Sequence, residues 1–193
     1  FFDPSWANPY NSIGPEVVES PAHLALTREA AGKSMVLLKN DKGVLPLDKN
    51  IRSLYITGPF AADANVLLGN YYGLSSSLST FLEGIVAKLN PGSKCDYKPG
   101  IMMEGENRNP IDWTTGDAKK ADAIVVVLGI TPLKEGEEGE SIASAHKGDR
   151  PDLNLPENQV NYLKKLRHNN NKPIIVVLTG GSPITMPEVT ELA

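Results

Sequence analysis

The fold class is predicted by one apolar run, Ala123-Ile124-Val125-Val126-Val127-Leu128-Gly129. The run is short, rich in β-branched residues and closed by a glycine, which is typical of a strand buried on both faces of a parallel sheet. Segments 53–58 (SLYITG) and 173–180 (PIIVVLTG) have the same character. Cys95-Asp96-Tyr97 is a candidate for a further strand. These segments predict a mostly parallel sheet.

Helical patterns alternate with the predicted strands. Apolar residues at helical spacing predict a helix from residue 22 to about residue 40, and Thr80-Phe81-Leu82-Glu83 has the spacing of a capping box that opens a helix over 80–90. Segment 114–121 and a segment that starts at Pro156 are predicted to be helical as well. Alternation of this kind predicts a three-layer α/β sandwich with right-handed crossovers.

The two ends of the chain differ from its middle. Residues 1–22 contain four prolines and no regular hydrophobic period, so we expect an extended linker before a domain over 23–193. The chain opens on Phe1 rather than on a methionine, and residues 188–193 resemble the start of a helix. We therefore expect a piece of a longer protein, with the domain incomplete at its C-terminus.

Composition narrows the classes of function. The 19 basic residues face 23 acidic ones and the net charge is −4, which argues against a nucleic-acid partner. The apolar runs are far shorter than the ~20 residues that a membrane span needs. With Cys95 as the only cysteine and three histidines, we expect no metal and no cofactor. A single cysteine is compatible with a periplasmic or secreted protein.

The loop after Gly129 is the main candidate for chemistry, because ligands of open α/β sheets bind beyond the carboxyl ends of the strands. It runs to Pro156, well beyond the ~12–15 residues of ordinary loops. Four glutamates fall within six positions, at 135, 137, 138 and 140. A carboxylic acid buried against a partner surface keeps its proton near neutral pH and can act as a general acid. A solvated acidic loop and a divalent-cation site remain alternatives.

Three other segments are weaker candidates. Gly58-Pro59-Phe60-Ala61-Ala62-Asp63 lacks the glycine order and the Lys-Ser/Thr of a nucleotide loop. Gly180-Gly181-Ser182-Pro183 is interpreted as a tight turn, because no glycine follows Ser182 at the spacing of a nucleophile elbow. The tyrosines in Asn70-Tyr71-Tyr72-Gly73 are interpreted as structural.

Short motifs follow one another in a specific order along nearly the whole chain. They are 30–40 (AAGKSMVLLKN), 45–47 (LPL), 56–59 (ITGP), 68–71 (LGNY), 80–85 (TFLEGI), 121–129 (ADAIVVVLG), 135–138 (EGEE), 148–150 (GDR) and 155–159 (LPENQ). This order resembles the second domain of family 3 glycoside hydrolases. The resemblance implies an α/β sandwich domain that packs on a preceding (β/α)₈ barrel domain, with the active site between the two.

The resemblance also implies a chemistry. Family members are retaining β-glycosidases in which an aspartate of the barrel attacks the sugar and a glutamate, usually from this second domain, acts as acid and then as base. By position, Glu135 is the predicted acid/base and Glu137 is the second choice. Asp149 and Arg150 match an Asp-Arg pair that we expect to order the loop through an ion pair.

The implied substrates are β-linked glucosides or xylosides cleaved at the non-reducing end. We expect the chain alone to be inactive, since the barrel would supply the nucleophile. The alternative function is a non-catalytic carbohydrate-binding or interaction module with an acidic, cation-binding loop.

Overall fold

The computed structural model describes residues 4–68, 73–107, 109, 111–135 and 148–193. The chain divides into two compact units, Phe1–Asn40 and Asp41–Ala193, and each is described by itself.

The first unit contains short helical turns and one α-helix. Three 3₁₀ turns, η1 (Ser5–Ala7), η2 (Pro9–Ser12) and η3 (Pro15–Val17), precede α1 (Pro21–Ser34). Prolines open the second and third turns and the helix, because their fixed φ suits the first helical position and their missing N–H is not needed there. Described residues of the predicted extended linker therefore form tight turns rather than a uniformly extended chain.

Helix α1 ends earlier than its apolar pattern predicts. Its last residue is Ser34, whose Oγ donates to the carbonyl of Ala31 at 2.8 Å, and Met35 is already extended with φ −77° and ψ 131°. Serine competes for backbone hydrogen bonds in this way and so favours helix ends. The prediction of a helix to about residue 40 is wrong by about six residues at this end.

The second unit is built on a parallel sheet. Its strands are β1 (Ser53–Thr57), β2 (Lys94–Lys98), β3 (Ala123–Gly129) and β4 (Ile174–Thr179), in the order β2-β1-β3-β4. Every neighbouring pair is parallel, and all residues of β3 are buried. All four predicted strands are confirmed.

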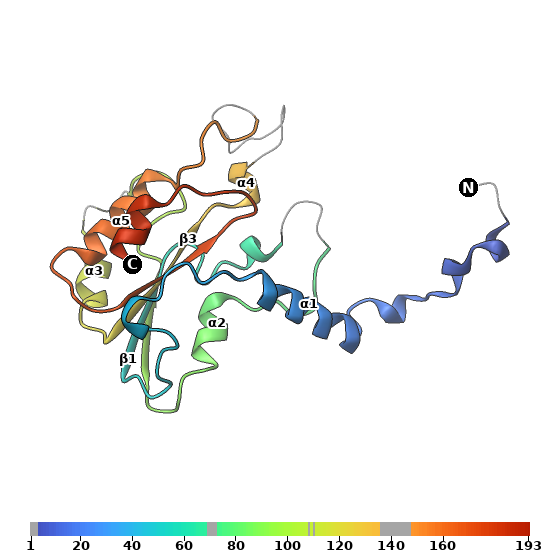
Figure 1. Cartoon of the computed structure of the whole chain (residues 1–193), viewed down its shortest axis with the longest axis horizontal. Coiled ribbons are helices and arrows are strands. Elements are labelled where there is room, and N and C mark those ends of the chain that lie inside the picture. The colour runs from blue at the N-terminus through green and yellow to red at the C-terminus, as the bar shows by residue number, and fades with distance from the viewer. Residues whose placement is uncertain (1–3, 69–72, 108, 110, 136–147) are drawn as a thin grey trace. The chain divides into compact units, whose positions relative to one another are not determined.

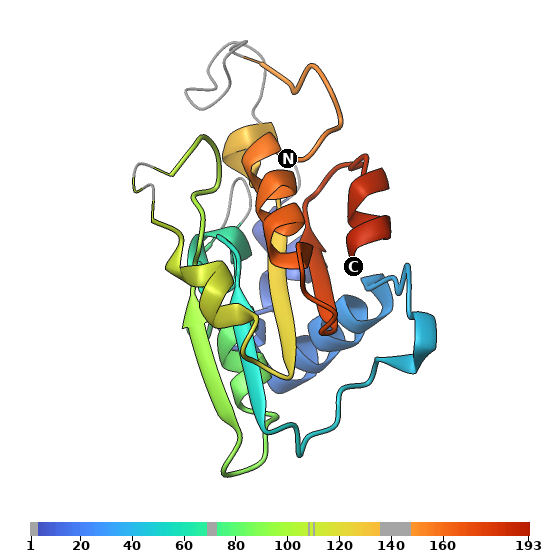
Figure 2. The ribbon, with the colours of Figure 1, turned by 90° about the vertical axis from the view of Figure 1, so that its left-hand side faces the viewer.

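Helices cover both faces of this sheet, as Figure 1 shows with α3 and α5 on one side and α2 on the other. On the first face, α3 (Trp113–Ala118), α5 (Glu157–Arg167) and α6 (Pro187–Leu192) enclose a core that includes Ile124, Val126, Leu163 and Leu166. On the second, α2 (Phe81–Val86) packs on Leu54, Ile56 and Val125. Figure 2 shows α5 and α6 beside each other. The three-layer α/β sandwich is confirmed.

The remaining helical pieces refine the predictions. The capping box of α2 is present, because Thr80 Oγ1 accepts from Glu83 N while the Glu83 carboxylate accepts from Thr80 N, although the helix stops at Val86. Helix α5 begins directly after Pro156, as predicted. Two short turns, η4 (Asp41–Gly43) and η5 (Ala64–Leu67), were not predicted. Neither was α4 (Pro132–Glu135), which makes the start of the long loop helical.

Candidate active site

The carboxyl ends of β3 and β4 lie side by side, because the two strands pair in register from Ile124 with Ile174 to Gly129 with Thr179. Gly129 has φ +149°, and a β-carbon there would overlap the carbonyl oxygen of Thr179. Only glycine lets the two backbones approach this closely at the turn. The loops that start at residues 130 and 180 therefore leave the sheet next to each other.

Glu135 lies directly above this point, at the end of α4. The amides of Lys134 and Glu135 donate to the carbonyl of Thr131 at 2.9 and 3.0 Å, which closes the single helical turn. The Glu135 side chain is half-buried. The helical turn therefore keeps the predicted acid/base close to the carboxyl end of the sheet.

Two residues from distant segments meet the Glu135 carboxylate. Ser182, in the loop after β4, donates its hydroxyl proton to Oε1 of Glu135. Arg150, at the far end of the long loop, donates from Nη2 to Ser182 Oγ at 2.8 Å and to the carbonyl of Pro183, also at 2.8 Å. The three side chains form one chain of hydrogen bonds, from guanidinium to hydroxyl to carboxylate.

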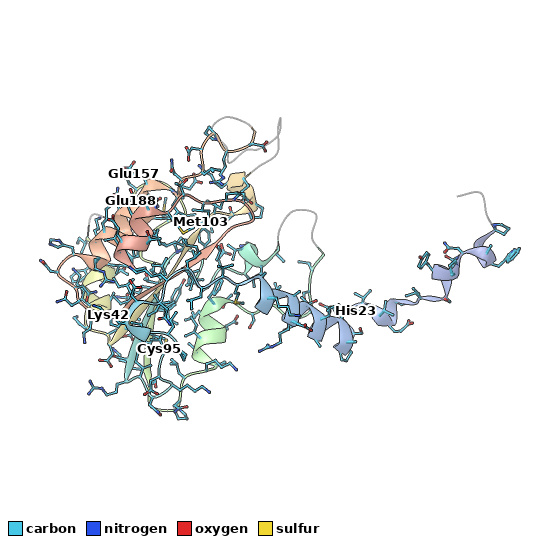
Figure 3. All side chains as sticks on the ribbon, in the orientation of Figure 1. His23, Lys42, Cys95, Met103, Glu157 and Glu188 are labelled. Carbon is cyan, nitrogen blue, oxygen red and sulfur yellow. The ribbon has the colours of Figure 1, made fainter. Side chains whose placement is uncertain are left out.

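A buried glutamine holds the base of the same loop. Gln159 is fully buried on α5, and its Oε1 accepts from Gly129 N at 2.8 Å. Its Nε2 donates to the carbonyls of Gly129 and Met103, both at 2.9 Å. Figure 3 labels Met103 in the segment after β2. Gln159 therefore fixes the point where the loop leaves β3 relative to the neighbouring segment.

The segment after β2 contacts both α4 and α5. Lys134 Nζ lies 3.2 Å from Glu104 Oε1, and Asn158 Nδ2 donates to the carbonyl of Met102 at 2.9 Å. Glu135 is thus carried on a turn that is bound on one side through Lys134 and on the other through Ser182. The Ser182 hydrogen bond acts on the carboxylate itself and restricts its position, as proton transfer at a defined atom requires, whereas the part-exposed Lys134 pair acts only on the turn that carries it.

Three buried polar atoms at this edge lack hydrogen-bond partners within the described part of the chain: Arg150 Nη1, Asn158 Oδ1 and Thr179 Oγ1. The fourth such atom, Tyr55 Oη, lies beside Thr114 in the core. Buried polar groups are almost always paired, so unpaired ones cluster where a ligand or another surface completes the structure. Within the described residues, three of the four unpaired buried polar atoms therefore lie at the carboxyl edge.

The predicted site residues have different outcomes. Glu135 and Arg150 come together through Ser182, whereas Asp149 is exposed. Glu137 and Glu138 lie outside the described residues. The guanidinium of Arg150 bonds to a hydroxyl and a carbonyl among the described residues, so the expected ion pair and its role in ordering the loop stay predictions.

Sequence reasoning missed Ser182 and Gln159. The pattern Gly180-Gly181-Ser182-Pro183 predicts a tight turn, whereas the position of Ser182 in the loop after β4, at the carboxyl edge of a parallel sheet, is the signal for a role in the site. Gln159 was noted only as part of the motif at 155–159. Its signal was a polar residue on the apolar face of a predicted helix, where a buried amide needs partners.

No cluster of three or more His, Cys, Asp or Glu suited to a metal ion occurs in the described ranges. The same ranges contain no helix with the length and apolar character needed to cross a membrane.

Comparisons with known proteins agree with this fold. A family model described as the glycosyl hydrolase family 3 C-terminal domain matches residues 35–193. The chain is 33% identical over 177 residues to a probable β-D-xylosidase of Arabidopsis thaliana, covering 91% of this chain and 22% of that protein. It is 35% identical over 184 residues to a probable exo-1,4-β-xylosidase of Aspergillus fumigatus, covering 95% of this chain and 22% of that protein.

The structural comparison points the same way. A solved family 3 exo-β-xylosidase, in complex with a xylobiose aziridine activity-based probe, superposes with a TM-score of 0.75 and 29% identity over 97% of this chain and 23% of that one. The chain thus spans less than a quarter of the length of these relatives. Because the family model matches well over half of its residues, the chain belongs to the glycosyl hydrolase family 3 C-terminal domain family.

Proposed function

We propose that this domain supplies Glu135 as the general acid/base of a retaining β-glycosidase, within a longer chain whose barrel domain supplies an aspartate nucleophile. The observation that carries the proposal is the fixed position of the Glu135 carboxylate, held by Ser182 at the carboxyl edge of the sheet. A glutamate in a purely solvated acidic loop would bond to water and would not need a hydrogen bond from Ser182 in the loop after another strand.

The reaction needs two carboxyl groups about 5–5.5 Å apart. In the first step Glu135 gives its proton to the leaving oxygen while the nucleophile forms a bond to the anomeric carbon. In the second step the Glu135 carboxylate takes a proton from water as that water's oxygen attacks the same carbon and frees the nucleophile. The buried polar atoms at this edge that lack partners among the described residues are proposed to bond to sugar hydroxyls or to the barrel surface.

The proposed substrates are β-linked xylosides, cleaved from the non-reducing end, with β-glucosides as the second choice. The support for xylose is that the relatives reported above are named β-xylosidases. The chain alone is proposed to be inactive, because it contributes the acid/base but not the nucleophile. Secretion or a periplasmic location stays a prediction.

The test is turnover by the full-length protein that carries this domain. Glu135→Ala is expected to lower kcat/KM by about 10²–10⁴-fold for xylobiose and much less for dinitrophenyl β-xyloside, whose leaving group needs no proton. Azide is expected to restore part of the turnover and to yield the β-xylosyl azide, since it attacks the intermediate without a base. The matched control is Glu191→Gln, on an exposed residue of α6, with wild-type rates expected.

Near-normal turnover of xylobiose by Glu135→Ala would move the acid/base role to Glu137 or Glu138, or leave the acidic segment as a non-catalytic, cation-binding or interaction surface. The second reading then predicts sugar or calcium binding by the chain alone, which titration calorimetry measures directly.

A further inference from the structure

The two oxygens of the Glu135 carboxylate have different surroundings. Oε1 accepts the proton of Ser182 Oγ, a residue 47 positions further along the chain. Oε2 lies 3.2 Å from the place where a β-carbon on Gly181 would be, so an alanine there would crowd it. One oxygen is therefore occupied by a hydrogen bond, and the other faces a residue that has no side chain.

The direction of the hydrogen bonds follows from chemistry. A guanidinium has donors and no acceptor, so the contact between Arg150 Nη2 and Ser182 Oγ uses a lone pair of the serine oxygen. The serine proton then points to a different acceptor, and among the described residues that acceptor is the Glu135 carboxylate. Arg150 thus fixes Ser182 as a donor to Oε1.

We propose that Ser182 is a positioning residue that assigns proton transfer to Oε2 of Glu135. This inference rests on the proposed acid/base role of Glu135. In the first step the proton leaves Oε2 for the leaving oxygen as the glycosidic C–O bond breaks. In the second step Oε2 takes a proton from the attacking water. The Ser182 proton stays on Oγ throughout, and the hydrogen bond to Oε1 holds the carboxyl plane in both steps.

Gly181 belongs to the same arrangement. A glycine at this position places no side chain against Oε2, while its neighbour Ser182 holds Oε1. The two consecutive residues after β4 thus lie next to different oxygens of one carboxyl group. Gly181→Ala would place a β-carbon against Oε2 without removing the Ser182 hydroxyl.

The experiment measures steady-state kinetics of the full-length protein with xylobiose, which needs acid assistance, and with dinitrophenyl β-xyloside, which does not. Ser182→Ala is expected to lower kcat for xylobiose by about 10–100-fold, since a misplacement of the reacting group by about 1 Å costs up to ~10²-fold, and to leave its KM within about threefold. The kcat/KM for dinitrophenyl β-xyloside should change less than about threefold. Ser182→Thr, which keeps the hydroxyl, should recover most of the loss.

Two further variants separate positioning from folding. Gly181→Ala is expected to show the same split between the two substrates, although the Ser182 hydroxyl is intact. Ser93→Ala, near the amino end of β2 and bonded only through its backbone among the described contacts, should match wild type. The kcat/KM for dinitrophenyl β-xyloside reports only the first step, which needs no acid assistance for this substrate, so it measures the fraction of folded active sites. A folding defect is recognised when the kcat/KM values of both substrates fall together.

The outcomes distinguish the inference from the function on which it rests. If Glu135→Ala loses xylobiose turnover while Ser182→Ala keeps it, the positioning role is wrong and the acid/base stands. Equal losses for both substrates in Ser182→Ala, with no recovery in Ser182→Thr, also overturn the positioning role. If Glu135→Ala keeps its activity, the acid/base proposal falls and this one falls with it.

Discussion

The amino and carboxyl edges of the sheet handle their polar groups differently. At the amino edge, Asp122 Oδ2 accepts from Ser53 N and Oγ at 3.1 and 3.0 Å, and Ser53 Oγ accepts in turn from Asp122 N at 2.9 Å. Arg52 and Lys172 add weaker contacts to the same carboxylate, at 3.7 and 4.0 Å. The polar groups at the amino edge are therefore paired with one another.

The carboxyl edge differs in how its buried polar atoms are hydrogen-bonded. Gln159 closes the backbone of Gly129, yet Arg150, Asn158 and Thr179 keep buried atoms without partners in the described part of the chain. The half-buried carboxylate of Glu135 lies among them. In the described part of the chain, the polar groups at the amino edge are paired with one another, whereas several buried ones at the carboxyl edge are not.

The largest effect on stability is expected from Gln159→Leu. Leucine fills the volume but leaves the N–H and C=O of Gly129 and the carbonyl of Met103 without their partner, at a cost of about 3 kcal/mol or more. Urea unfolding of the chain measures the change. Asn161→Leu, exposed on the same helix, is the matched control and should change stability by less than about 0.5 kcal/mol. A small loss in Gln159→Leu would mean that the loop base is held by other contacts.

A smaller effect is expected from Tyr162→Phe. Tyr162 on α5 shares a buried hydrogen bond of 2.6 Å with Thr57, the last residue of β1, and burial raises the pKa of the phenol, so it stays neutral. Loss of this bond should cost about 1 kcal/mol without changing turnover of the full-length protein. A double-mutant cycle with Thr57→Val measures the coupling directly. A coupling energy near zero would show that the Thr57–Tyr162 hydrogen bond does not contribute to the free energy of unfolding.

At the amino edge, Ser53→Ala should lower the melting temperature less than Tyr162→Phe does, because water can replace the lost partner of the partly exposed Asp122. The hydrogen bond from the Ser53 side chain holds the pKa of Asp122 below its usual value. A lowered folded-state pKa stabilises the fold above the unfolded value of about 3.9 and less so as pH falls through the folded value.

The deficit of Ser53→Ala should therefore be constant from about pH 7 to pH 5 and shrink below about pH 4, with activity unchanged throughout. Thermal melts at several pH values measure it. A deficit that persists at pH 2 would contradict the role given to the ionised carboxylate.

The smallest effect on stability is expected from Lys134→Met. The side chains of Lys134 and Glu104 are 34% and 43% exposed, so the pair should contribute no more than a few tenths of a kcal/mol and should weaken in salt. Because Lys134 neighbours Glu135 on α4, turnover of xylobiose should nevertheless fall in the full-length protein. A similar fall in Glu104→Gln would attribute the effect to the Lys134–Glu104 ion pair. Unchanged turnover in both variants would show that the Ser182 side suffices to hold α4.

Most of the fold could be predicted from local patterns. The β-branched runs at 123–129 and 173–180 have the character of buried parallel strands, and the structure places β3 and β4 there. Helix ends were predicted less well, because Ser34 and Val86 end their helices through local hydrogen bonding and packing that a hydrophobic period does not describe. The short helix α4 was missed since a single turn has no period.

The α/β class, the strands and the segment that holds the acidic candidate can be predicted from the sequence. Each of these is a local property, a run of side chains or a motif along the chain. The contacts of Ser182 and Arg150 around Glu135, and the closure of the loop base by Gln159, are visible only in the folded chain. They arise from the strand order, because β3 pairs with β4 and brings residues 47 positions apart to one edge, and no spacing in the sequence contains that pairing.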